Sequence, residues 1–180
     1  MRYGQLWILS MVLAAVTVPS VARADMGGTI VQKIATPHYR LELDIGRPEQ
    51  MFTAADAAKM HPSSGEIMVS GTMTGPMPGM AGMAAGPGSA SGMGAWRHLE
   101  LHVTDKTTGT AVEYAAVRIT VTNTATGKRT DIPIAQMYGV KEGFEDWHYG
   151  NNALMPPGSY IITCEVNGDH ATFQATIPNM

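Results

Sequence analysis

The chain has 180 residues and a formal net charge of −3, with 12 Lys and Arg against 15 Asp and Glu. A mildly acidic chain lacks the basic face that binds nucleic acid, so we expect no nucleic-acid partner. Charged residues make up only 15% of the sequence, and 14 Met and 20 Gly fill much of the remainder. This length predicts one globular domain with additional segments.

Residues 1–24 have the features of a secretory signal peptide. Arg2 supplies a positive charge, residues 6–18 form an apolar run, and Ala-Arg-Ala at 22–24 is a small-x-small cleavage site. The apolar run is too short and too weakly flanked for a stable transmembrane helix, although an uncleaved N-terminal anchor is the alternative. We expect cleavage after Ala24 and export of residues 25–180 as a single domain.

The first half of this domain predicts two strands and one short helix. Residues 38–45 alternate apolar and polar side chains with the period of a half-buried strand. Thr53 is a candidate N-cap for a short helix over 53–60, and a second short strand is expected over 66–70. Residues 71–95 contain neither aromatic nor charged residues and have no period. This Met/Gly/Pro-rich stretch predicts a long flexible loop inserted in the domain.

From Trp96 onward the sequence predicts strands joined by turns, with Asn167-Gly168 as the strongest signal of a tight hairpin. A long loop is expected over 137–152. Regular short strands of this kind are typical of an all-β fold, a β-sandwich of immunoglobulin-like or cupredoxin-like type. The expected strands cover residues 98–103, 112–121, 129–134, 160–166 and 171–177.

The sequence offers no constellation for covalent catalysis. Motifs for a nucleophilic serine, a phosphate-binding loop, a dinucleotide site or a helical zinc protease are all missing from it. Cys164 is the only cysteine, so an internal disulfide and a thiolate-rich zinc site are both excluded. Its alternation with Tyr160 and Ile162 predicts a buried core residue. We therefore expect that the protein is not an enzyme.

One predicted strand and the loop after it carry potential metal ligands. His98 and Glu100 are two residues apart and share a face, so both can approach one ion. His102 lies about 13 Å from His98 along the same strand and is expected on the solvent face. Met137 and His148 add a thioether and an imidazole, which favour copper, while a carboxylate admits Fe(II) or Mn(II). The alternative is that these residues are only the polar face of a half-solvated strand.

Three short motifs resemble the periplasmic iron-transport accessory family, whose members are small secreted β-sandwich proteins that bind copper and assist iron uptake. They are His-Leu-Glu at 98–100, Pro-Ile-Ala-Gln-Met at 133–137 and His-Tyr-Gly-Asn-Asn at 148–152. The resemblance covers residues 96–177. It implies an immunoglobulin-like fold, a periplasmic location, a homodimer and an inner-membrane iron permease as partner.

The resemblance also implies a set of ligands. In the family, the metal is held by the His and Glu of the first motif, a Met, the His of the third motif and a further His. The matching positions here are His98, Glu100, Met137 and His148. The family supplies the further His from a longer hairpin, whereas His170 is the only candidate near the tight turn here. For His170, a ligand role and a plain surface position are equally open.

Five methionines in the flexible insertion have two interpretations, a soft-metal arm that collects Cu(I) or a linker in which Met is merely tolerated. They are Met73, Met77, Met80, Met83 and Met93. The leading function is a periplasmic protein that binds copper or iron, with manganese a further candidate, and passes metal to a membrane permease. The alternatives are a copper-tolerance or copper-delivery protein that uses the arm, and a metal-free immunoglobulin-like interaction module.

Overall fold

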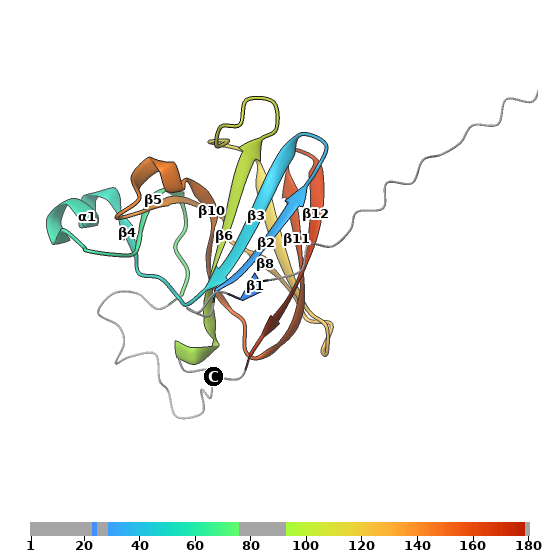
Figure 1. Cartoon of the computed structure of the whole chain (residues 1–180). Coiled ribbons are helices and arrows are strands. Elements are labelled where there is room, and N and C mark those ends of the chain that lie inside the picture. Colours follow the sequence, from blue (N-terminus) through green and yellow to red (C-terminus); the bar gives the residue numbers. More distant parts are fainter. Residues whose placement is uncertain (1–22, 25–28, 76–92, 179–180) are drawn as a thin grey trace, which may run out of the picture.

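The computed structural model describes residues 23–24, 29–75 and 93–178, which fold into two β-sheets packed face to face (Figure 1). This arrangement confirms the predicted all-β sandwich. Most of the predicted signal peptide lies outside the described residues, apart from Arg23 and Ala24. Residues 76–92 of the predicted flexible insertion also lie outside them.

The larger sheet has eight strands in the order β1-β2-β3-β6-β10-β9-β5-β4. Neighbouring strands are antiparallel except β4 and β5, which are parallel. The bounds are β1 (Arg23–Ala24), β2 (Ile30–Ala35), β3 (Tyr39–Gly46), β4 (Met51–Thr53), β5 (Glu66–Gly71), β6 (Trp96–Asp105), β9 (Ala135–Gly139) and β10 (His148–Leu154).

The smaller sheet has four antiparallel strands in the order β12-β11-β7-β8. Asn167 and Gly168 adopt positive φ angles of 49° and 92° and join Val166 to its partner Asp169. Two left-handed residues match the twist of the flanking strands, which confirms the predicted tight hairpin. The bounds are β7 (Val117–Asn123), β8 (Arg129–Ile132), β11 (Gly158–Val166) and β12 (Asp169–Ile177).

The core lies between the two sheets. It is built from the inward-facing residues of strands in which buried and exposed side chains alternate. Leu41, Leu43 and Ile45 of β3 are each 1% exposed, as their alternation predicts. Ile162 and Cys164 of β11 are fully buried in the same cluster, which confirms the predicted position of the cysteine. The outward residues of the large sheet are thereby left available for a site.

One short helix, α1 (Ala54–Met60), follows β4 and lies with β4 and β5 to one side of the sandwich (Figure 1). Its N-cap is Thr53, whose hydroxyl accepts from the backbone N–H of Asp56 at 3.1 Å, as the sequence predicts. Short 3₁₀ turns, η1 (Met93–Ala95) and η2 (Gly143–Asp146), precede β6 and β10. Among the described residues, no helix is long and apolar enough to cross a membrane.

The prediction of a long loop over 137–152 is wrong, because this stretch forms the end of β9, then η2 and then β10. Residues 148–153 of β10 are all buried, since β10 pairs on both sides and is covered on both faces. A strand buried in this way shows no alternation of apolar and polar residues. The two predicted ligands placed in this loop therefore lie on rigid, paired strands.

The predicted strand over 112–121 begins too early, because β7 starts only at Val117. The buried hydroxyl of Tyr149 donates to the carbonyl of Val112 at 2.7 Å and accepts from the N–H of Ala115 at 2.8 Å. Tyr114 has a positive φ of 57°. The Tyr149 side chain thus provides the hydrogen bonds that strand pairing would otherwise give to these backbone groups.

Asp169, at the start of β12, connects the small sheet to the turn before β3 through hydrogen bonds. Its Oδ2 accepts from the Thr36 hydroxyl at 2.6 Å and from the His38 backbone N–H at 2.9 Å. These bonds lower the pKa of Asp169 from 3.8 to about 2. A carboxyl with a depressed pKa contributes stability that is present above the unfolded pKa and is lost as pH falls through the folded pKa.

We therefore expect Asp169→Asn to lower the melting temperature at pH 7. The difference from the wild type should shrink as pH falls from about 4 to about 2, because the wild-type carboxyl is then protonated. Thermal unfolding of both proteins across this range measures the difference. A difference of equal size at pH 7 and pH 2 would contradict the assigned role of the charge.

Candidate metal centre

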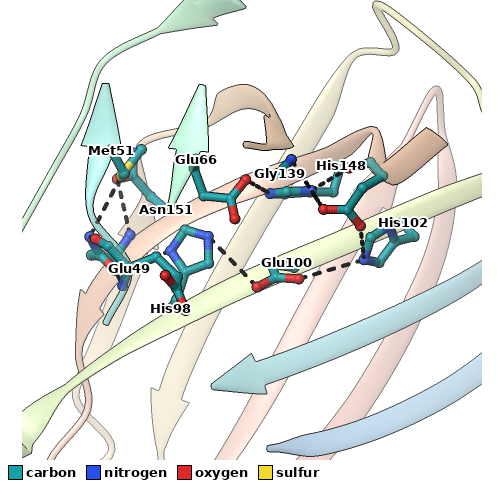
Figure 2. A network of polar contacts seen from close by, with 11 residues as sticks. Glu49, Met51, Glu66, His98, Glu100, His102, Gly139, His148 and Asn151 are labelled. Carbon is teal, nitrogen blue, oxygen red and sulfur yellow. Dashed lines mark hydrogen bonds and ion pairs between the residues drawn. The ribbon is translucent and has the colours of Figure 1, made fainter. Parts of the chain in front are cut away.

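The outer face of the large sheet carries a row of polar side chains on β6 and β10. On β6, the residues His98, Glu100 and His102 alternate with core residues and share this face. On β10, Asn152 pairs with His98, and His148 lies four residues before Asn152, beside His102. Figure 2 shows the side chains of His98, Glu100, His102 and His148 gathered beside β6. Strand pairing therefore fixes the spacing of the groups.

Two fully buried imidazoles, His98 and His148, lie at the middle of this row with ring centroids 6.0 Å apart. The His98 Nδ1 is 3.0 Å from the Asn152 side-chain oxygen, and the His148 Nδ1 donates to the Asp146 carbonyl at 2.7 Å. Both oxygens accept a hydrogen bond from an Nδ1–H group. The lone pair of each neutral ring therefore lies on Nε2. Neither Nε2 has a hydrogen-bond partner among the described residues.

Burial keeps both rings uncharged. It lowers the pKa of His98 to about 4, and it also lowers the pKa of His148, against the opposing effect of Glu100. At pH 7 both Nε2 atoms therefore present lone pairs without a proton. This is the form of histidine that binds a metal ion.

Glu66 at the start of β5 completes a first ligand group with these two rings. Its Oε2 lies 3.4 Å from the His148 Nε2 and has no hydrogen-bond partner among the described residues. One ligand atom each from Glu66, His98 and His148 lies within 4.8 Å of the others. Burial, followed by repulsion from Glu100, raises the pKa of Glu66 to about 8. At pH 7 this carboxyl therefore holds its proton in the metal-free protein. A cation at this point would displace that proton and supply the partner that the three buried atoms lack.

A second ligand group comprises Glu100, His102 and His148, and it is nearer to solvent. The His102 Nε2 lies 3.7 Å from the Glu100 Oε2, with both side chains about one-quarter exposed. Burial opposes both charges, but the mutual attraction prevails and leaves the pKa of Glu100 lowered and that of His102 raised. His148 belongs to both groups and thus joins the buried position to the more exposed one.

A hollow of about 330 Å³ opens beside the centre and gives access to it. Burial raises the pKa of its Glu49 and Asp146 carboxyls. Lys141 is the only basic residue of the lining. The negative potential of these walls favours a cation approaching from solvent. The lining consists of Glu49, Ser64, Gly65, Glu66, Glu100, Lys141, Glu142 and Asp146.

The structure brings together three of the four main predicted ligands, namely His98, Glu100 and His148. Met137 is fully buried on β9, directly opposite His148 in the strand register. His170 does not join the centre, because it lies on the exposed face of β12 in the other sheet, where it pairs with Glu165.

The predicted soft-metal arm is described only at its first methionine. Met73 is partly buried and packs against Met51 and Met137. Met77, Met80 and Met83 lie outside the described residues, and the side chain of Met93 is likewise not described.

Two residues of the centre, His102 and Glu66, were not predicted as ligands from the sequence. His102 was expected to face solvent alone, but its ring centroid lies 5.3 Å from that of His148 on the neighbouring strand. His98 and His102 are too far apart along β6 to bind the same ion. His148 on the neighbouring strand β10, however, lies close to both rings. Glu66 gave only one signal, a carboxylate at the start of an otherwise apolar strand.

Asn152 acts as a positioning residue for His98. Besides contacting the His98 ring, its amide donates to the Glu49 carbonyl at 2.8 Å and its oxygen accepts from the Glu49 N–H at 3.0 Å. We expect Asn152→Ala to weaken Cu(II) binding roughly 10- to 100-fold, the usual effect of losing an outer-shell partner. Titration with Cu(II), beside circular dichroism to confirm the fold, measures this. An unchanged affinity would mean that the orientation of His98 does not matter.

Comparisons with known proteins bear on the fold. Neither a scan against protein-family models nor a search of curated proteins found a match. Among solved structures, FetP of uropathogenic Escherichia coli strain F11, expressed in the periplasm of E. coli, matches with a TM-score of 0.50 and 12% identity, over 84% of this chain and 97% of FetP.

Two copper-containing structures match at 13% identity and a TM-score of 0.49. They are a copper-bound variant of the same FetP, over 83% of this chain and 95% of that one, and copper-reconstituted P19 from Campylobacter jejuni, over 86% and 100%. The similarity to FetP shows a shared fold. FetP matches the family that the motifs at 98–100, 133–137 and 148–152 resemble.

Proposed function

We propose that the chain is an exported, periplasmic copper-binding protein that assists iron uptake. One observation carries the proposal: the Nε2 atoms of His98 and His148 and the Oε2 of Glu66 are buried, close together and without hydrogen-bond partners among the described residues. Buried polar atoms normally form hydrogen bonds. A group of three such atoms without hydrogen-bond partners, close to one another, therefore favours binding of a cation.

The donor set favours copper. Two neutral imidazoles supply the buried nitrogen ligands, carboxylates complete the groups, and a thioether side chain lies next to His148. Imidazole and thioether suit copper, and copper leads the affinity order of the divalent first-row metals at such ligands. Fe(II) also binds sets of two His and one carboxylate, but Fe(II) and Mn(II) stand below copper in that affinity order. Copper is also the metal in the FetP variant and P19 structures, but the donors of this chain carry the choice.

The residues of the centre suggest how the protein binds and releases metal. Carboxylates of the hollow attract a cation, Glu100 and His102 offer ligands near solvent, and Glu66 and His98 offer ligands inside. His148 serves both positions, so one ligand can stay bound while the others exchange. Asn152 and the Asp146 carbonyl hold the two rings in the ligating tautomer. In this proposal iron is the cargo, and bound copper supports the redox chemistry of iron. The protein is a homodimer that is not an enzyme, and a membrane permease receives the iron from it.

The metal content of the purified protein tests the binding step. We expect about one copper per chain after loading with Cu(II) and removal of unbound ion, and none in a His98→Ala, His148→Ala double variant. His170→Ala is the matched control, because that histidine is exposed on the other sheet. Absence of bound copper in the wild type would overturn the proposal.

Uptake of labelled iron by cells tests the transport step. Cells that lack the protein should take up less iron under iron limitation, and the wild type should restore uptake while the double variant does not. Restoration by the double variant would separate iron uptake from the metal centre.

A copper-delivery role is the second candidate, because Met73 joins a buried group of methionines beside the centre. It predicts that deletion of residues 73–93 lowers copper capture and leaves iron uptake unchanged. The third candidate, a metal-free interaction module, requires that wild type and double variant both lack bound metal and bind partners equally.

A further inference from the structure

A second apolar cluster lies beside the metal centre and consists mainly of methionine. Met51 of β4 and Met137 of β9 are 4% and 0% exposed and enclose Ala135. Met68 of β5 and Met73, two residues beyond that strand, pack against them partly buried. We call these four methionines the methionine cluster. Four separate segments of the chain contribute to it.

The composition of the methionine cluster differs from that of the main core. In the part of the chain that the structure describes, the main core contains 21 buried and 8 partly buried hydrophobic residues, and Met155 is the only methionine among them. In the methionine cluster, four of five such residues are methionine. Leu, Ile and Val fill space with fewer rotamers to restrain, and the main core uses them. Filling space therefore does not account for this concentration of thioethers.

The cluster adjoins both buried imidazoles. In the strand register, Met137 lies between Met68 on β5 and His148 on β10, on one face of the sheet. The Met51 sulfur accepts from the Asn152 amide at 3.5 Å, and the oxygen of that amide contacts the His98 ring. The thioethers thus border the centre through Met137, opposite His148, and through Met51, which contacts Asn152.

We propose that the methionine cluster is a binding site for Cu(I), a soft monovalent cation. A thioether sulfur is neutral and polarisable, so it binds Cu(I) and its mimic Ag(I) but gives little to hard divalent ions. A single positive charge is also the least costly charge to bury among neutral ligands. The imidazole and carboxylate groups next to it suit Cu(II). The two neighbouring sites would thus accept the two oxidation states of one metal.

Silver provides the test, because Ag(I) is not reduced or oxidised under these conditions and leaves NMR signals sharp. The full chain is labelled with ¹³C at the methionine methyl groups, and each signal is assigned with a single Met→Leu variant. One equivalent of Ag(I) should shift the four signals of the methionine cluster. The signals of Met60, which is exposed, and of Met155 in the main core should not move.

A triple variant, Met51→Leu, Met68→Leu, Met137→Leu, measures the contribution of the cluster to affinity. Leu preserves apolar volume, so the fold should be retained. We expect Ag(I) affinity to fall at least tenfold, while Met155→Leu leaves it unchanged. A second variant replaces Met77, Met80, Met83 and Met93 by Leu.

Unshifted cluster signals, or silver binding that is lost only in the second variant, would overturn this proposal. Cu(II) binding by the wild-type protein and by its His98→Ala, His148→Ala double variant, in both of which all four methionines are kept, reports separately on the imidazole centre. Failure of the methionine site and failure of the copper centre are therefore distinguishable.

Discussion

Replacing His148 by Gln should abolish tight Cu(II) binding, because His148 belongs to both ligand groups. His98→Gln removes a ligand from the buried group only, and His102→Gln removes one from the outer group only. We expect the affinity loss in His148→Gln to exceed the roughly 100-fold that an outer-shell change causes. Each of the other two variants should lose less than His148→Gln.

Competition with a chelator of known copper affinity measures this order. Gln is similar in size to His, so the buried position stays filled, and circular dichroism verifies the fold. His170→Gln serves as the control because that side chain lies on the exposed face of the other sheet. Copper affinity in His148→Gln equal to that in His98→Gln would show that the two groups are not joined through His148.

The sequence predicted several of the strands that bury one face, although not β2, and it missed β10, which is buried on both faces. In β3, Leu41 and Leu43 point to the core while Arg40 and Glu42 point outward, so a period of two is visible. In β10, polar residues such as Asn151 are as buried as Tyr149. Their amides bond to backbone of other segments, for example Asn151 to Thr72 and Pro133. Tertiary contacts, which no local pattern reveals, make that strand.

The candidate site was predictable to the extent that it lies on one strand. His98 and Glu100 follow from their spacing of two, and the motif at 148–152 drew attention to His148. His102 required the pairing of β6 with β10, because opposite residues on paired strands come within about 5.5 Å whatever their sequence separation. Glu66 required the order β10-β9-β5, because it lies opposite Gly139 on β9 and reaches across that strand to His148. Met137 was placed in a loop, whereas its pairing with His148 puts it on a strand beside that ring.

Gly150 marks the closest approach of the two strands that build the centre. It pairs with Glu100, between the positions of His148 and Asn152. A Cβ at Gly150 would overlap the backbone carbonyl of Leu99 on β6. Backbone cannot turn away as a side chain can, so β6 and β10 would have to separate. The same separation would draw His148 and Asn152 away from His102 and His98.

Gly150→Ala should therefore cost both stability and metal binding. We expect the free energy of unfolding to fall by more than about 4 kcal/mol, within the exceptional range for a single substitution. Gly94→Ala is the matched control, because no atom lies within 4 Å of a Cβ built there. Urea unfolding of both variants gives the free energies, and Cu(II) titration of the folded fraction gives the affinity. If Gly150→Ala unfolds like Gly94→Ala, the strands can separate without cost, and their close approach does not hold the imidazoles in place.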